Sequence, residues 1–107
     1  MRHTGGMLAR LSSRSEAIAE ACRRHDATAL TVFGSAATDT YDDDSDVDLL
    51  VSFAPDSPLS RFDAYFGLKE ALEEILLRPV DLVTPSALEN PFFARSVEAS
   101  RIDLYAA

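Results

Sequence analysis

Apolar spacing and helix-cap residues predict three helices along the chain. A helix is expected over about residues 10–25, because apolar or small side chains recur there at spacings of three and four, namely at Leu8, Leu11, Ser15, Ile18 and Cys22. A second helix is expected over about residues 58–77, with an apolar stripe formed by Tyr65, Leu68, Leu72 and Ile75. Asn90 as N-cap and Pro91 in the first turn predict a short third helix to about Ser100, followed by an extended tail.

Short apolar runs between these helices predict three strands, at residues 29–33, 46–53 and 79–84. The order helix, strand, strand, helix, strand, helix predicts an α/β fold, a small mixed sheet with helices packed on it. The helical connection between the second and third strands is long enough for a right-handed parallel crossover.

Length, hydropathy and cysteine content narrow the class of protein. At 107 residues the chain is expected to form a single domain over residues 1–107, and the order of residues 1–9 is left open. No apolar run approaches the roughly 20 residues that span a membrane, and the first residues lack the apolar core of a signal peptide. Cys22 is the only cysteine, so no internal disulfide can form. These features favour a cytoplasmic protein without a membrane partner.

The net charge of -8 is unevenly distributed. Residues 1–25 carry five Lys or Arg and two Asp or Glu, whereas the rest carries five and sixteen, so the two parts have charges of +3 and -11. Direct nucleic-acid binding is disfavoured, because it depends on phosphate neutralisation by Lys and Arg. A basic protein partner or a cation site suits the acidic part better, although the charge taken alone is better explained as maintaining solubility.

A Gly-Ser pair closes the first predicted strand. Gly34 would let a phosphate approach the backbone, and Ser35 offers a hydroxyl to it. If the next residues begin a helical turn, their free N–H groups point at the same phosphate. Taken alone, however, Gly-Ser is a common turn.

Two acidic residues, Asp46 and Asp48, stand at the head of the second predicted strand. Strand alternation puts both side chains on one face, roughly 6.5 Å apart along the chain. Two such carboxylates repel each other and are costly to bury unpaired. A bound divalent cation would remove both the repulsion and the cost of burial. An EF-hand is excluded, because its required glycine and its final glutamate would fall at Val47 and Phe53.

A third acid, Asp81, interrupts the apolar third strand. Together with Asp46 and Asp48 it supplies the third ligand that a two-metal site needs. The sequence is equally consistent with another role for Asp81, as an acid on an edge strand that pairs with Arg78. The preceding acidic residues 42–44 are best explained as a solvated loop.

The combination of these motifs resembles the minimal nucleotidyltransferases (MNT) of the DNA polymerase beta superfamily. Their signature is Gly-Ser, ten residues and Asp-x-Asp, with a further acid in a later Val-Asp-Leu-Val strand. It is met here over roughly residues 28–105 by Gly34-Ser35, Asp46-Val47-Asp48 and Asp81.

The resemblance implies a polymerase beta-like fold and an enzyme that uses ATP and two Mg²⁺ ions. Gly34 and Ser35 would hold the triphosphate, Asp46 and Asp48 would bind both metals, and Asp81 would bind the metal that activates the attacking hydroxyl. Many members of this size are antitoxins, and the best-understood ones transfer AMP to a tyrosine of a HEPN-type ribonuclease toxin. The expected partner is therefore a basic HEPN-type toxin in a hetero-oligomer.

One departure from the family pattern follows the Gly-Ser pair. The family commonly has Gly-Ser-x-Ala-Arg-Gly, whereas here Thr38 and Asp39 occupy the last two positions. The missing arginine would normally lie near the phosphates, and an aspartate nearby weakens binding of an anionic nucleotide. Arg61 and Lys69 are the candidates to replace that arginine.

Two alternatives to an AMP-transferring antitoxin remain open. One is a non-catalytic antitoxin that neutralises its toxin by covering it, with little or no transfer. The other is a transferase for a small hydroxyl compound such as an aminoglycoside, although such enzymes generally carry an additional substrate domain for which 107 residues leave no room.

Overall fold

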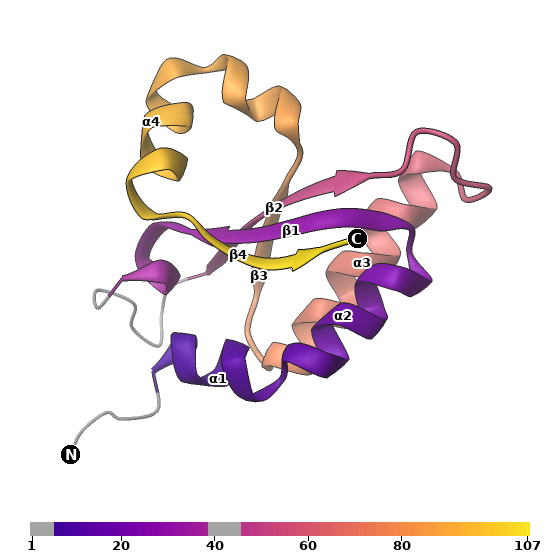
Figure 1. The fold of residues 1–107 in the computed structure, drawn as a ribbon, viewed down its shortest axis with the longest axis horizontal. Coiled ribbons are helices and arrows are strands. Elements are labelled where there is room, and N and C mark those ends of the chain that lie inside the picture. Colours follow the sequence, from indigo (N-terminus) through magenta and orange to yellow (C-terminus); the bar gives the residue numbers. More distant parts are fainter. Residues whose placement is uncertain (1–5, 39–45) are drawn as a thin grey trace.

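The computed structural model describes residues 6–38 and 46–107. Helices and short 3-10 turns alternate with strands along these residues (Figure 1). In chain order the elements are α1 (Met7–Ser13), α2 (Ser15–Arg24), β1 (Ala27–Phe33), the turn η1 (Gly34–Ala37), β2 (Val47–Phe53), α3 (Arg61–Leu76), β3 (Val80–Val83), the turn η2 (Pro85–Glu89), α4 (Pro91–Ser100) and β4 (Ile102–Ala106). No helix in the described ranges is long and apolar enough to cross a membrane.

The strands of the described residues form one mixed sheet in the order β3-β2-β1-β4. β2 and β3 run parallel, as the crossover through α3 predicted, and β1 runs antiparallel to both of its neighbours. The predicted α/β fold with a small mixed sheet is confirmed. The tail expected to be only extended is in fact the edge strand β4, which pairs with β1 and whose Asp103 Oδ1 accepts a hydrogen bond from Thr31 Oγ1 at 3.0 Å.

Helices cover the two faces of the sheet unequally. α1, α2 and α3 lie on one face, and α4 lies on the other (Figure 1). Along β2, Val47 and Leu49 are fully buried in the core that β2 shares with α2 and α3. Leu50 faces the other way and packs with Val97 of α4. Asp48 shares this second face by strand alternation, so it lies on the α4 side of the sheet.

The first helical segment differs from the prediction in its start and its continuity. It begins at Met7 rather than near residue 10, because Met7 is buried in the main core. It also breaks at Arg14, which separates α1 from α2. Arg10 Nη1 donates to the carbonyl oxygen of Leu76 at 2.7 Å and so ties α1 to the end of α3. The apolar spacing continues across the break, which is why it predicted one helix.

Local caps determine both ends of α3, which is shorter at its start than predicted. Ser60 has an extended backbone, and its Oγ accepts the N–H of Asp63 at 3.0 Å, as an N-cap does. Leu77 has a left-handed φ of 60°, and its N–H donates to the carbonyl oxygen of Glu73 at 2.8 Å. The helix therefore stops just before β3 begins.

Candidate active site

Two acidic residues lie side by side on the α4 face of the sheet, where the parallel strands β2 and β3 begin, and a third precedes one of them. Asp48 and Asp81 are direct partners in the parallel register, and Asp46 comes immediately before β2. Asp46 and Asp81 are exposed, whereas Asp48 is partly buried. The tertiary structure thus brings together the three acids that the sequence singled out.

The pKa of Asp48 is affected by the charges of the other two acids. The pKa of the Asp48 carboxyl is raised from 3.8 to about 6, mainly by burial and further by the negative charges of Asp81 and Asp46. A bound divalent cation would compensate this charge and is therefore favoured by the site.

The donor set suits a hard cation such as Mg²⁺, which prefers carboxylate oxygens. Within residues 6–38 and 46–107, however, no three His, Cys, Asp or Glu side chains form a group arranged to hold a metal ion. The acids are neighbours, but they do not form a complete ligand set in this conformation. The roles of Asp46, Asp48 and Asp81 as metal ligands stay a prediction.

A side chain of α3 is hydrogen-bonded to the start of β3, the strand that carries Asp81. Glu73 Oε2 accepts the N–H of Val80 at 2.9 Å and the ammonium of Lys69 at 3.0 Å. These bonds lower the pKa of the Glu73 carboxyl. The larger effect comes from the bond with Val80 and the smaller from the bond with Lys69. Because Val80 immediately precedes Asp81, the contact helps to hold that acid in register with β2.

The Gly-Ser turn packs directly against Asp48. Gly34 follows β1 with a φ of 72°, a backbone conformation that favours glycine. A Cβ at this position would lie 2.5 Å from Asp48 Oδ2, so the carboxylate and the turn are in close approach. The residues from Gly34 form the helical turn η1, as the phosphate-binding hypothesis required. Ser35 lies in that turn and is partly buried.

The end of the turn is closed by Thr38, where the family arginine is missing. The N–H and the Oγ1 of Thr38 each donate to the carbonyl oxygen of Ser35, both at 3.2 Å. Asp39 and the acidic residues 42–44 lie outside the described residues.

The two basic residues considered as replacements for that arginine lie at the other end of β2 or on the other face of the sheet. Arg61 borders a small surface hollow together with Phe53, at the far end of β2 from Asp48. Lys69 is paired with Glu73 on α3, which covers the opposite face of the sheet. Neither residue replaces the missing charge at the Gly-Ser turn.

The alternative role of Asp81 is only half supported. Asp81 does lie on an edge strand, since β3 ends the sheet. However, the ion pairs formed between described residues do not include a pair of Asp81 with Arg78.

A residue that the sequence did not indicate also reaches the turn. The N–H of Gly34 donates to Ser100 Oγ at 2.8 Å, across a separation of 66 residues. Ser100 is the last residue of α4, and no sequence signal distinguishes it from any other serine at a helix end.

Asp48→Asn is expected to stabilise the metal-free protein near neutral pH and to lose this advantage in acid. The folded-state pKa of Asp48, about 6, lies above that of an unfolded aspartate. Ionisation therefore costs stability above that pKa, and the cost disappears as the pH falls to about 4. We expect about 1 kcal/mol, less than the full shift implies, because Asp48 is only partly buried and solvent screens it. Urea unfolding in EDTA at about pH 7.5 and about pH 4.5 measures the difference in unfolding free energy between variant and wild type. The same difference at both pH values would contradict the prediction.

Comparison with known protein families points to the same chemistry. The chain matches the nucleotidyltransferase domain family over residues 14–104. It is 36% identical over 73 residues to a Methanocaldococcus jannaschii protein named as a candidate protein adenylyltransferase, a match that covers 68% of this chain and 72% of that protein. A second protein of that organism with the same kind of name is 34% identical over 73 residues, which cover 68% of this chain and 71% of that protein.

Solved structures share the fold. A structure described as a candidate minimal nucleotidyltransferase superposes with a TM-score of 0.73 at 34% identity, covering 94% of this chain and 98% of that chain. A chain from a complex of a tri-AMPylated Shewanella oneidensis HEPN toxin with an MNT antitoxin superposes with a TM-score of 0.61 at 20% identity, covering 91% and 73% of the two chains. These neighbours confirm the predicted polymerase beta-like fold.

Proposed function

Since this chain belongs to the nucleotidyltransferase domain family, as its motifs predicted, we propose that it transfers AMP from ATP to a tyrosine hydroxyl of a HEPN-type ribonuclease toxin, as that toxin's antitoxin. The observation that carries the proposal is the close approach of the Gly-Ser turn to Asp48, which is itself a neighbour of the other two acids. Asp48 is in register with Asp81, and Gly34 closely approaches the Asp48 carboxylate. A triphosphate bound to the turn would therefore lie next to the acids.

Each part of the site has a role in this reaction. Asp46, Asp48 and Asp81 would hold two Mg²⁺ ions, which when bound neutralise the triphosphate and lower the pKa of the acceptor hydroxyl. Gly34 would let the triphosphate approach the backbone of the turn, and Ser35 would offer its hydroxyl to it. The acceptor oxygen bonds to the α-phosphorus, the bond to pyrophosphate breaks, and the hydroxyl proton passes to solvent. The protein thus contributes mainly positioning and charge neutralisation.

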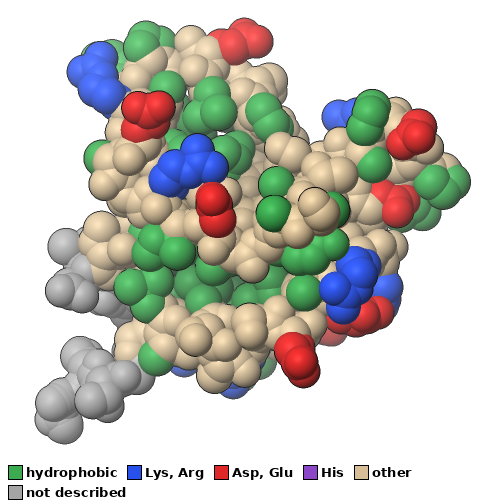
Figure 2. Space-filling model, in the orientation of Figure 1, with side chains coloured by type: hydrophobic (Ala, Val, Ile, Leu, Met, Phe, Trp, Pro, Cys, Tyr) green, Lys and Arg blue, Asp and Glu red, His purple; other side chains and the backbone are tan. Residues whose placement is uncertain are grey.

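A protein acceptor is supported by the relatives and by the net charge. The Methanocaldococcus jannaschii relatives are named as candidate protein adenylyltransferases, and the Shewanella oneidensis complex contains an AMPylated HEPN toxin. A net charge of -8 complements a basic partner and speeds encounter with it. The face shown in Figure 2 carries acidic and basic side chains interspersed, so the attraction follows from the total charge rather than from one acidic patch there.

The second candidate function is an antitoxin that binds its toxin without modifying it. It is favoured by Thr38, which stands where the family has an arginine, and by the positions of Arg61, at the other end of β2, and of Lys69, on the opposite face of the sheet. A turn that lacks this family arginine binds a triphosphate more weakly, since each opposite charge close to a phosphate contributes to its affinity.

Incubation of the chain with ATP, Mg²⁺ and its proposed HEPN-type partner is expected to add AMP to a tyrosine of that partner. The Mg²⁺ requirement follows from three acids that cannot by themselves attract an anionic nucleotide. Mass spectrometry of the partner measures the added groups and locates them, and chelation of Mg²⁺ should prevent their addition. A stable complex with an unmodified partner would instead identify the non-catalytic antitoxin.

A further inference from the structure

The hydroxyl of Ser100 links the last turn of α4 to the Gly-Ser turn. Ser100 Oγ accepts the N–H of Gly34 at 2.8 Å and donates to the carbonyl oxygen of Ser96 at 3.0 Å. The hydroxyl proton is therefore used within α4, and an oxygen lone pair is directed at the turn. One side chain thus connects a helix backbone to a backbone amide beside the acids.

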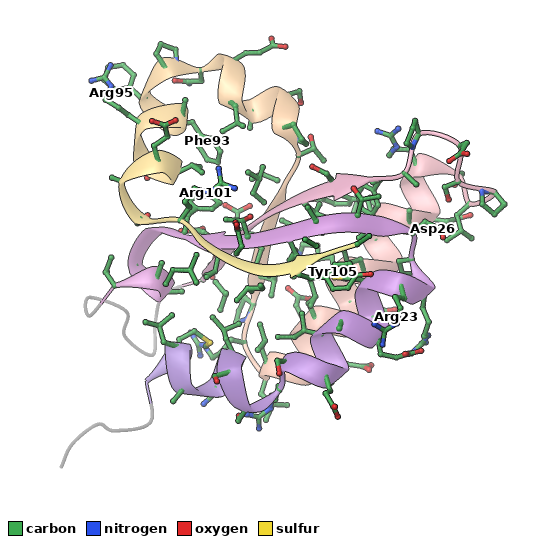
Figure 3. The ribbon with its side chains drawn as sticks, viewed as in Figure 1. Arg23, Asp26, Phe93, Arg95, Arg101 and Tyr105 are labelled. Atoms are coloured by element: carbon green, nitrogen blue, oxygen red, sulfur yellow. The ribbon has the colours of Figure 1, made fainter. Side chains whose placement is uncertain are left out.

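α4 is well suited to serve as a fixed support for this bond. Its start is capped by Asn90, whose Oδ1 accepts the N–H of Phe92 at 2.9 Å. Phe93 points from α4 toward the sheet (Figure 3), and its ring meets that of Phe33 edge to face, with centroids 5.2 Å apart. Val97 is almost fully buried on the same side of the helix. The position of the helix end is therefore determined by packing on the sheet.

The contact with Phe33 adds to the effect of Ser100, because Phe33 and Gly34 are consecutive. α4 holds the end of β1 through an aromatic pair and the first residue of the turn through a hydrogen bond. Gly34 is also the residue that closely approaches Asp48 Oδ2. A shift of the turn away from Ser100 would therefore change the spacing between Ser35 and the Asp48 carboxylate.

We propose that Ser100 is a positioning residue for nucleotide binding, which holds the Gly34 amide so that the turn carrying Ser35 stays beside the Asp48 carboxylate at the spacing a triphosphate requires. This inference rests on the proposed function, since it assumes that the turn binds the phosphates. It also assigns the Gly34 N–H to Ser100, which leaves Ser35 and the amides after it to contact the nucleotide.

Ser100→Ala is expected to weaken the binding of ATP with Mg²⁺ about five- to tenfold, the effect of one lost hydrogen bond. Calorimetric titration measures the dissociation constant. Ser96→Ala is the matched control, because it makes the same change one turn earlier on α4 and keeps the carbonyl that Ser100 uses. It should bind as the wild type does. Ser100→Thr retains the hydroxyl and should restore most of the affinity.

Hydrogen exchange of the Gly34 amide, followed by NMR, provides a readout that needs no nucleotide. Ser100→Ala should accelerate this exchange about tenfold or more, since the amide loses its acceptor. Ser96→Ala should leave it unchanged. An exchange rate unaffected by Ser100→Ala would overturn the anchoring itself.

The two measurements separate this inference from the proposed function. If the wild type binds ATP and Ser100→Ala binds it equally well, the positioning role is wrong and the proposed function stands. A lower melting temperature with unchanged ATP affinity would likewise show a merely structural role. If the wild type does not bind ATP with Mg²⁺, the proposed function fails, and with it the nucleotide role of Ser100.

Discussion

Replacing Asp46 and Asp48 together by asparagine is expected to reduce AMP transfer at least about a thousandfold, roughly 4 kcal/mol of activation free energy. Asparagine keeps the size of the side chain but removes the negative charges that two divalent cations need. The chain should stay folded, because in the metal-free protein Asp46 and Asp81 repel the partly buried Asp48. Transfer is measured by mass spectrometry of the partner, and folding by circular dichroism.

Asp56→Asn is the matched control for the double variant. Asp56 is exposed in the turn after β2, at the opposite end of that strand from the acids. The control should transfer AMP at the wild-type rate. Loss of folding in the double variant would make Asp46 and Asp48 structural residues, and retained Mg²⁺-dependent transfer would refute their role as metal ligands.

Gly34→Ala is expected to impair both transfer and stability. The left-handed φ of 72° costs a residue with a side chain roughly 1–2 kcal/mol. The new Cβ would lie 2.5 Å from Asp48 Oδ2, so either the turn or the carboxylate must move. Because a misplacement of about 1 Å in a catalytic group can cost about a hundredfold, we expect a loss of transfer of at least that size. Urea unfolding and the same mass assay measure the two effects.

The control for this variant is Gly6→Ala. A Cβ at Gly6 meets nothing within 4 Å, so the same change should leave transfer unaltered, and any loss of stability should come only from the N-cap position of α1. If Gly34→Ala transferred AMP at the wild-type rate, the close approach of the turn to Asp48 would have no catalytic importance.

The elements predicted well are those whose signals are local. The strand from Val47 to Phe53 contains a run of buried apolar residues such as Leu49 and Leu50, and this apolar run located it. The start of α4 follows from Asn90 and Pro91, because the cap joins residues two and three positions apart. Such signals are complete within a few neighbouring residues, so they can be recognised without the fold.

The features that were missed depend on contacts between distant segments. The sequence predicted an extended tail but not its pairing with β1, which includes the hydrogen bond from Thr31 to Asp103. The early start of α1 depends on the burial of Met7 in a core made by other elements. The link from Ser100 to Gly34 spans 66 residues and leaves no local pattern.

By itself the sequence identified the family of this protein, and the tertiary structure decided which groups meet. The motif with Gly34, Asp46 and Asp48 identified the family, and strand alternation assigned both acids to one face, since alternation is a property of the backbone. Only the parallel register placed Asp81 beside Asp48, and only the packing of α4 brought Ser100 to the turn. Register and packing depend on cores formed by segments far apart in the chain, and no local pattern encodes which segments those are.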